Sequence, residues 1–243
     1  MIDTIVLDLD GPLLDGRDRH YQCYRDILLE QGLEPVPVAK YWRLKRGRVD
    51  RRRLLSLSGA SDFYDGFLAA WLRRIESKKY LRMDRLQDRA MDVLQAWKGA
   101  GVTVVLATMR NNPDHLMWQL RHLGLAGFFD EVVAVGCGLG WEGKAERVRP
   151  VLARSRRGGS VYWVGDTETD VCAARALGVR ICALTCGLRT ESYLAGFNPD
   201  LLKRDLWSFF AEWLRSERPA GKSRVNGGRV PPTGPLPAEK GFL

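Results

Sequence analysis

The feature that most constrains this chain is a series of short apolar runs, rich in β-branched residues, separated by segments with helical periodicity. The runs occupy residues 4–10, 102–108, 131–135, 160–166 and 180–186. Strands that alternate with helices along a chain indicate βαβ units, which place parallel strands in one sheet. The runs that begin at 102 and 160 are apolar on both faces, as central strands are when helices cover each side. The sequence therefore predicts an α/β fold with a doubly wound parallel sheet.

Helical periodicity also fills the long segment between the first two runs, which is far longer than a βαβ crossover needs. Apolar residues share one helix face in two stretches of it: Tyr21, Tyr24, Ile27 and Leu28, then Phe63, Phe67, Trp71 and Ile75. We therefore predict an inserted α-helical cap domain over residues 15–80, with a Rossmann-like core made of residues 1–14 and 81–215. Core helices are expected at 84–99, 112–124, 144–155, 168–177 and 205–216.

Composition sets the remaining broad expectations. Beyond about residue 216 the chain becomes rich in Pro, Gly and basic residues, so residues 216–243 are predicted to form a disordered tail. The first residues lack a signal peptide, and no apolar run reaches the length of a membrane span, so we expect a soluble cytoplasmic protein, a monomer or homodimer. Five scattered cysteines without zinc spacing indicate reduced thiols.

Two acids follow the first run, in the order Asp8, Leu9, Asp10, Gly11. Because side chains alternate across a strand, the carboxylates of Asp8 and Asp10 project to the same side. Such a pair is costly unless a cation lies between the acids or one of them is protonated. Ligands of open parallel sheets bind beyond the carboxyl ends of the strands, where these acids lie. They are candidate site residues, and an ordinary Asp turn is the alternative.

Two further candidates carry a hydroxyl and an amine. Thr108 ends the second run and is followed by Asn112 and Pro113, a helix N-cap and first helical residue. Its hydroxyl and the free backbone N–H groups there could hold a phosphate oxygen, although a plain strand-to-helix turn has the same pattern. Lys144 is the only lysine between Lys98 and Lys203. A solvated lysine at a helix start is the alternative interpretation.

The last candidate motif is Gly165-Asp166-Thr167-Glu168-Thr169-Asp170, between a strongly apolar strand and a helical segment. Asp166 is expected at the strand end and Asp170 in the first helical turn, so both could face one pocket as hard oxygen ligands for Mg²⁺. Acids in a first helical turn also favour the helix dipole without binding anything.

Together with the insert, these elements resemble the haloacid dehalogenase superfamily, specifically a phosphoglycolate-phosphatase-like hydrolase with a helical cap. Its pattern is hhhDxDGxhxD, then a strand ending in Thr or Ser, then a lysine, then hhhGDxxxD, where h is apolar and x is any residue. The matching residues are Asp8, Asp10, Gly11, Asp15, Thr108, Lys144, Asp166 and Asp170. The match extends over residues 3–207, including residues 198–209, which look like the family's last strand and helix.

The resemblance implies a Mg²⁺-dependent phosphatase that hydrolyses a small phosphorylated metabolite. Asp8 would attack phosphorus and form an aspartyl phosphate, and Asp10 would act in turn as general acid and base. Mg²⁺ would be bound by Asp8, Asp166 and the carbonyl of Asp10, with Asp170 in support. Two residues would bind the phosphate oxygens, namely Thr108 and Lys144. Asp15 would serve the hinge.

Other functions remain open at this point. A sugar-phosphate mutase of the same fold would use the same acids, whereas dehalogenation is disfavoured because it does not need Asp10. The net charge of +9 also suits nucleic acid bound by the basic cap and tail, although we do not expect this partner.

A basic run in the expected cap suggests how a substrate is chosen. Residues 40–53 carry eight basic side chains and one acid. Charge runs are usually solvated, but arginines offer forked donors suited to carboxylates or phosphates. We hypothesise that Arg46 and Arg48, with Arg110 from the core, select substrates that carry a second anionic group.

Overall fold

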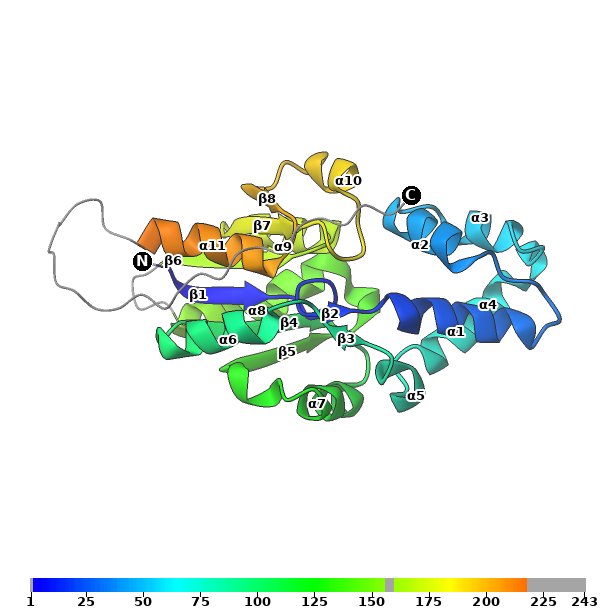
Figure 1. Cartoon of the computed structure of the whole chain (residues 1–243), viewed down its shortest axis with the longest axis horizontal. Coiled ribbons are helices and arrows are strands. Elements are labelled where there is room, and N and C mark those ends of the chain that lie inside the picture. The colour runs from blue at the N-terminus through cyan, green and yellow to red at the C-terminus, as the bar shows by residue number, and fades with distance from the viewer. Residues whose placement is uncertain (1, 156–159, 218–243) are drawn as a thin grey trace, which may run out of the picture.

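The computed structural model describes residues 2–155 and 160–217, and it shows an α/β core with a helical region at one end (Figure 1). The predicted tail, from residue 218 onward, lies outside the described residues. No described helix combines the length and apolar character needed to cross a membrane. All five cysteines are free.

A parallel sheet forms the centre of the core, and its described strands follow the order β5-β4-β1-β6-β7-β8. The strands are β1 (Ile2–Leu7), β4 (Thr103–Met109), β5 (Glu131–Val135), β6 (Ser160–Gly165), β7 (Arg180–Leu184) and β8 (Leu201–Lys203). Every neighbouring pair is parallel. The chain runs first to one side of β1 and then to the other, so the doubly wound sheet is confirmed.

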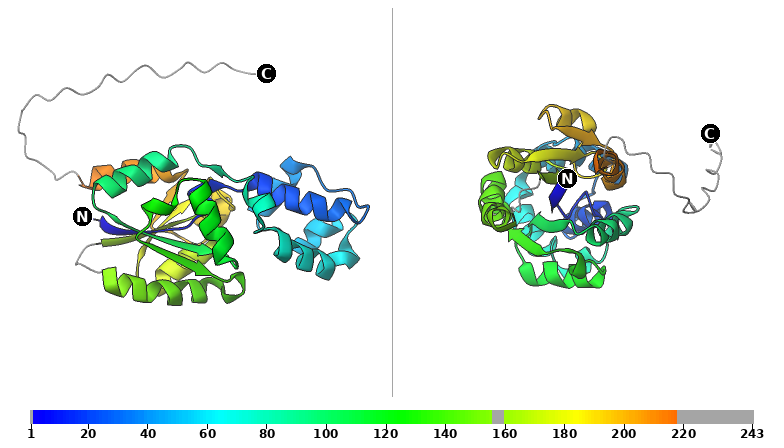
Figure 2. Two further views of the ribbon diagram at one scale, coloured as in Figure 1. Left: turned by 90° about the horizontal axis from the view of Figure 1, so that it is seen from below. Right: turned by 90° about the vertical axis from the view of Figure 1, so that its left-hand side faces the viewer.

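Helices cover both faces of the sheet because successive side chains of each strand point to opposite sides (Figure 2). Ile5 and Leu7 of β1 lie in one buried cluster, with α6 (Ala90–Gly99), α7 (Pro113–His122) and α11 (Leu206–Glu217). Val6 lies in the other, with α8 (Gly140–Ser155), α9 (Glu168–Ala176) and α10 (Glu191–Ala195). Short 3-10 turns are η2 (Ala126–Phe128) and η3 (Cys137–Leu139).

The inserted helical region follows β1 and has its own buried core. Its elements are α1 (Arg17–Leu29), α2 (Val38–Arg46), α3 (Arg51–Ser56), η1 (Ser61–Phe63), α4 (Tyr64–Arg74) and α5 (Lys78–Leu81). Both predicted apolar stripes contribute to that core. We call this region the cap. It is joined to the core through a two-stranded ribbon in which β2 (Leu14–Asp15) pairs with β3 (Arg85–Leu86).

Two core helices begin at different residues from those expected. The helix predicted from residue 84 begins at Ala90, because Arg85 and Leu86 pair with β2 instead. The helix predicted from Lys144 begins at Gly140. Lys144 therefore lies one turn inside α8 rather than at its exposed start.

Candidate active site

Three adjacent strands end at the same edge of the sheet, facing the cap. Asp8 follows β1, Thr108 is the next-to-last residue of β4, and Asp166 follows β6. Because the strands are parallel, their carboxyl ends bring these residues together although they are far apart in the chain. They are 7%, 1% and 0% exposed.

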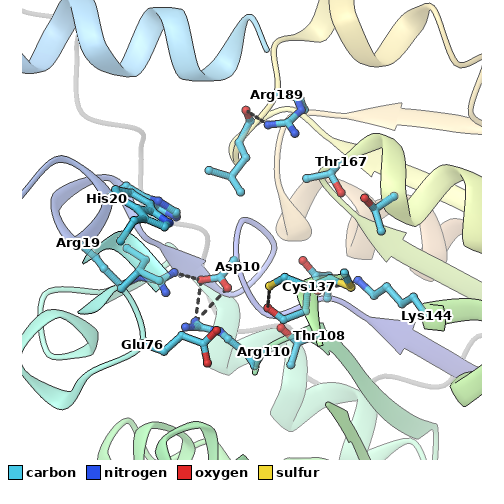
Figure 3. Close-up of a pocket in the computed structure, with 16 residues that line it drawn as sticks. Asp10, Arg19, His20, Glu76, Thr108, Arg110, Cys137, Lys144, Thr167 and Arg189 are labelled. Atoms are coloured by element: carbon cyan, nitrogen blue, oxygen red, sulfur yellow. Dashed lines mark hydrogen bonds and ion pairs between the residues drawn. The ribbon is translucent and has the colours of Figure 1, made fainter. Parts of the chain in front are cut away.

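A cavity of about 280 Å³ lies between these strand ends and the cap. Asp8, Asp10, Thr108 and Lys144 line it from the core, as do Arg110, Thr167 and Thr169 (Figure 3). Trp71, Ile75 and Glu76 line it from the cap, with Arg19 and His20 from α1. The structure thus brings the side chains of Asp8, Asp10, Thr108 and Lys144 around one cavity.

Lys144 is the cation that lies between the carboxylates of Asp8 and Asp170. Its Nζ donates to Oδ1 of Asp8 at 2.9 Å and to Oδ1 of Asp170 at 2.7 Å. The side chain is 1% exposed, so it is not a solvated surface lysine. Burial would lower the pKa of Lys144, but the charges of Asp170 and Asp8 outweigh burial and raise it. The amine is therefore a fixed positive charge beside Asp8.

Asp170 positions this lysine and also caps α9. Its Oδ2 accepts hydrogen bonds from the backbone N–H and the hydroxyl of Thr167, at 3.2 and 2.8 Å. Its Oδ1 accepts from Trp163 Nε1 at 3.1 Å as well as from Lys144. The first-turn acid thus has its helix-capping role and a site role at once.

Asp166 offers the clearest place for a metal ion. Among the described residues, Asp8, Asp166 and Asp170 each present an oxygen within 4.8 Å of the others. Oδ2 of Asp166 accepts from the backbone N–H of Leu188, whereas Oδ1 is buried without a partner in the described part of the chain. An unpartnered buried carboxylate oxygen among acids fits a hard divalent cation such as Mg²⁺.

Two glycines let the backbone approach the Asp166 carboxylate. A Cβ on Gly11 would lie 2.2 Å from its Cγ, and one on Gly187 would lie 1.9 Å from its Oδ2. Gly11 also has a φ of +97°, which L side chains rarely adopt. Any side chain at either position would displace Asp166.

Burial dominates the protonation of these acids. It raises the pKa of Asp8 from 3.8 to about 7, an effect that Lys144 opposes and that Asp170 and Asp10 reinforce. Burial, together with the charges of Asp8 and Asp170, also raises the pKa of Asp166. Ionising both carboxylates is therefore costly unless positive charge is added between them.

This arrangement predicts the pH dependence of stability without divalent cations. Above pH 3.8 the unfolded chain has lost the Asp8 proton, whereas the folded protein keeps it until about pH 7. The contribution of Asp8 to the free energy of unfolding should therefore fall as pH rises across this interval. Calorimetry in EDTA should show that the Tm difference between wild type and Asp8→Asn shifts in favour of Asp8→Asn as pH rises from 5 to 7. A difference that does not change with pH would contradict this result.

Asp10 lies in a separate ion-pair network. Its carboxylate accepts from Arg19 Nη2 and, at 3.0 Å, from Arg110 Nη2 (Figure 3). Arg19 Nε also donates to Asp84 Oδ1 at 2.9 Å, and Gln119 Nε2 donates to Asp84 Oδ2 at 2.7 Å. The network joins the cap helix α1 to the core, and it directs the Asp10 carboxylate to guanidinium groups rather than to the other acids.

The two acids of this network have opposite pKa shifts. Burial would raise the pKa of Asp10, but the charges of Arg110 and Arg19 outweigh burial and lower it. Burial raises the pKa of Asp84 to about 6 despite Arg19. Asp10 is therefore ionised in this arrangement.

The three arginines considered for substrate selection have different positions. Arg110 lines the cavity, but its guanidinium contacts Asp10. Arg46 donates to the carbonyls of Thr185 and Arg189, and it does not line this cavity. The exposed Arg48 donates to Glu168 at 2.9 Å. Arg46 and Arg48 thus connect the cap to core loops.

The cap also contacts the core on the other side of the cavity. The Glu76 carboxylate accepts from the backbone N–H groups of Asn111 and Asn112, at 3.0 and 2.9 Å, just before α7. Together with the contacts of Arg46 and Arg48, these hydrogen bonds of Glu76 hold the cap over the strand ends.

Four polar residues that make contacts at the site were not predicted from the sequence: Arg19, Asp84, Gln119 and Glu76. Arg19 is 2% exposed although it lies on a helix whose apolar stripe was recognised. Charged residues are almost never buried without a partner, and nothing local marks which ones have partners. These residues can be found only through their contacts.

Comparison with known proteins identifies the family of the chain. The sequence profile of the haloacid dehalogenase-like hydrolases matches residues 2–178. No curated protein sequence matches the chain significantly.

Among solved structures, a haloacid dehalogenase-like family protein from Streptococcus pneumoniae is 19% identical, with a TM-score of 0.66 over 87% of this chain and 98% of that one. A predicted phosphatase from Clostridium acetobutylicum is 16% identical, with a TM-score of 0.68 over 88% and 99%. A predicted phosphoglycolate phosphatase from Haemophilus somnus is 18% identical, with a TM-score of 0.67 over 89% and 98%. At these identities the likeness shows a common fold, and the profile match shows the family. The chain belongs to the haloacid dehalogenase-like hydrolases.

Proposed function

We propose that this hydrolase is a Mg²⁺-dependent phosphatase that hydrolyses a small phosphomonoester through an aspartyl phosphate on Asp8. The observation that carries the proposal is the buried Asp8 carboxylate, which lines the cavity between core and cap, lies 2.9 Å from Lys144 Nζ and is beside Asp166. A second acid, Asp10, lines the same cavity. Asp8 therefore borders a space that a phosphate group could occupy.

Nucleophilic attack would use the Asp8 carboxylate. The Asp8 oxygen forms a bond to phosphorus as the bond to the leaving oxygen breaks, and water later hydrolyses the acyl phosphate. Lys144 and the Thr108 hydroxyl would hold phosphate oxygens and neutralise their charge, as phosphoryl transfer requires. Lys144 can do so because two carboxylates keep it protonated.

The metal ion would be held by Asp8, Asp166 and the carbonyl of Asp10, with Asp170 in support through Lys144. When bound, Mg²⁺ supplies positive charge that lets an anionic carboxylate approach an anionic phosphate. Oδ1 of Asp166, buried and without a partner among the described residues, supports this assignment.

Asp10 would transfer protons to the leaving oxygen and from the hydrolytic water. Arg19 and Arg110 keep it ionised in the free enzyme. A phosphate dianion that enters the cavity competes for these cations, which raises the pKa of Asp10 and lets it carry a proton. Arg19 comes from the cap, so cap position and the protonation of Asp10 are connected.

Asp10→Asn should therefore slow hydrolysis in proportion to the basicity of the leaving group. We expect roughly a 100-fold to 1,000-fold loss of kcat with alkyl phosphates, whose alkoxide needs a proton. The loss should be much smaller with 4-nitrophenyl phosphate, whose phenolate leaves unprotonated. Steady-state kinetics on both substrates measure the difference. Equal losses on the two would remove Asp10 from proton transfer.

A screen of phosphorylated metabolites with Mg²⁺ tests the proposed function directly. Released inorganic phosphate is the expected product. Glucose 1-phosphate should be included and assayed for its isomer, because isomer without phosphate release would identify a mutase. Absence of phosphate release from every phosphomonoester, in folded Mg²⁺-loaded protein, would overturn the phosphatase proposal.

A further inference from the structure

A second cavity, of about 440 Å³, lies within the cap and adjoins the first. Trp71 of α4 and Arg189 of the core line both cavities. Most of the other lining residues are aromatic or basic: Tyr24, Tyr41, Tyr64 and Phe67, with Lys45, Arg48 and Arg51. A molecule bound near Asp8 could thus extend past Trp71 into the cap.

The positive charge of this cavity is only partly neutralised. Arg48 and Arg189 both donate to Glu168, at distances of 2.6 to 2.9 Å. Lys45 and Arg51 have no carboxylate partner within residues 2–155 and 160–217. Both lie over the Trp71 ring, at 5.4 and 5.8 Å from its centroid.

The one acid in the wall, Asp50, has another role. Its Oδ1 accepts the backbone N–H of Arg52 at 2.7 Å and so caps the N-terminus of α3. It forms no ion pair with Lys45 or Arg51, both of which are partly buried. The cavity therefore keeps two basic side chains, Lys45 and Arg51, that a bound anion could pair with.

The positive charge of Lys45 is correspondingly unfavourable in the free protein. Burial, and then the charges of Arg51 and Arg189, lower its pKa from 10.5 to about 7. A bound anion would reverse this effect by adding the missing opposite charge.

The aromatic wall of the cavity is well packed. The ring centroids of the stacked pair Tyr24 and Tyr41 are 4.6 Å apart, and those of the stacked pair Phe67 and Trp71 are 5.8 Å apart. Packed rings offer an apolar surface without further ordering.

We propose that Lys45 and Arg51 bind the second anionic group of a phosphomonoester whose scissile phosphate lies at Asp8, with an apolar spacer against Trp71. The proposal rests on the phosphatase function above and names its substrate class. It assigns selection for a second anion to the interior of the cap, whereas Arg46 and Arg48 contact the core.

Matched probes can test this site. We would compare phenyl phosphates whose para position carries a two-carbon or four-carbon chain that ends in a carboxylate, a phosphonate or a primary amide. A charged hydrogen bond to Lys45 or Arg51 should raise kcat/KM for the charged probes over the amide by about tenfold or more. The carboxylate and phosphonate arms distinguish which anion is preferred. An equal kcat/KM for charged and amide probes at both chain lengths would overturn the proposal.

Variants then assign the preference to residues. Lys45→Gln and Arg51→Gln should each bring the charged-to-amide ratio close to one, and Lys45→Arg should keep most of it. The controls Lys40→Gln and Arg53→Gln remove exposed charges of the same basic run that do not line the cavity. They should leave the ratio unchanged. Equal loss on charged and amide probes in Lys45→Gln and Arg51→Gln, at unchanged Tm, would contradict a second-anion site.

A binding measurement separates this site from the phosphatase proposal. The phenol 3-(4-hydroxyphenyl)propanoate carries the carboxylate but no phosphate, and calorimetric titration should detect its binding to wild-type protein and weaker binding to Lys45→Gln. Lys45-dependent binding without hydrolysis of any phosphomonoester would retain the anion site and reject the phosphatase function. Hydrolysis without charge preference and without this binding would retain the phosphatase function and reject the anion site.

Discussion

Asp8→Asn should abolish turnover while the protein stays folded. Asparagine has nearly the same volume but cannot attack phosphorus, and it also removes a proposed metal ligand. We expect kcat to fall by at least about 1,000-fold. Folding should not suffer, because the buried carboxylate has a pKa raised to about 7 and is itself unfavourable when ionised. Without metal, the Tm at neutral pH should be equal to or above that of the wild type.

The matched control is Asp62→Asn, which removes an exposed carboxylate of the cap outside the cavity. Its kcat should equal that of the wild type. Kinetics and calorimetry on both variants measure the comparison. Residual activity of Asp8→Asn above a few percent would exclude Asp8 as the nucleophile, and a large loss of Tm would mean that Lys144 needs both of its carboxylate partners.

Removing divalent cations should lower the rate of hydrolysis about as much as the Asp8→Asn substitution does. EDTA should reduce hydrolysis to background, and Mg²⁺ should restore it. Ca²⁺ should not, since it prefers more ligands at longer distances and would misplace Asp8. Magnesium should also stabilise the protein at neutral pH, by about 2.7 kcal/mol at a concentration 100 times its Kd.

Asp166→Asn tests metal binding with a readout besides activity. It changes the carboxylate whose Oδ1 has no partner among the described residues, so it should lose the Mg²⁺-dependent rise in Tm as well as activity. Thermal denaturation with and without Mg²⁺ measures this effect. Turnover by fully chelated wild-type protein would overturn the metal assignment, whereas an unchanged rise in Tm in Asp166→Asn would place the ion elsewhere.

Much of the fold follows from local patterns. Strand and helix periodicities are set by residues near one another in the chain, so the parallel sheet and the helical insert could be predicted. The ribbon of β2 and β3 could not, because it consists of two residues paired with two others about 70 positions away, too short to give a periodic signal. The same pairing is the reason that α6 begins at Ala90 rather than at residue 84.

The candidate site likewise has some features that follow from local sequence and others that depend on tertiary contacts. The sequence alone determined which acids follow the strands, because a motif and its strand are contiguous, and parallel strands bring their ends to one edge. Only the tertiary structure decided that Lys144 is buried against Asp8 and Asp170, that Arg19 reaches Asp10 from the cap, and that Lys45 and Arg51 face a cavity while Arg46 does not. Whether a charged side chain is solvated or buried depends on partners supplied by distant segments, and burying a charge is tolerated only where those partners lie.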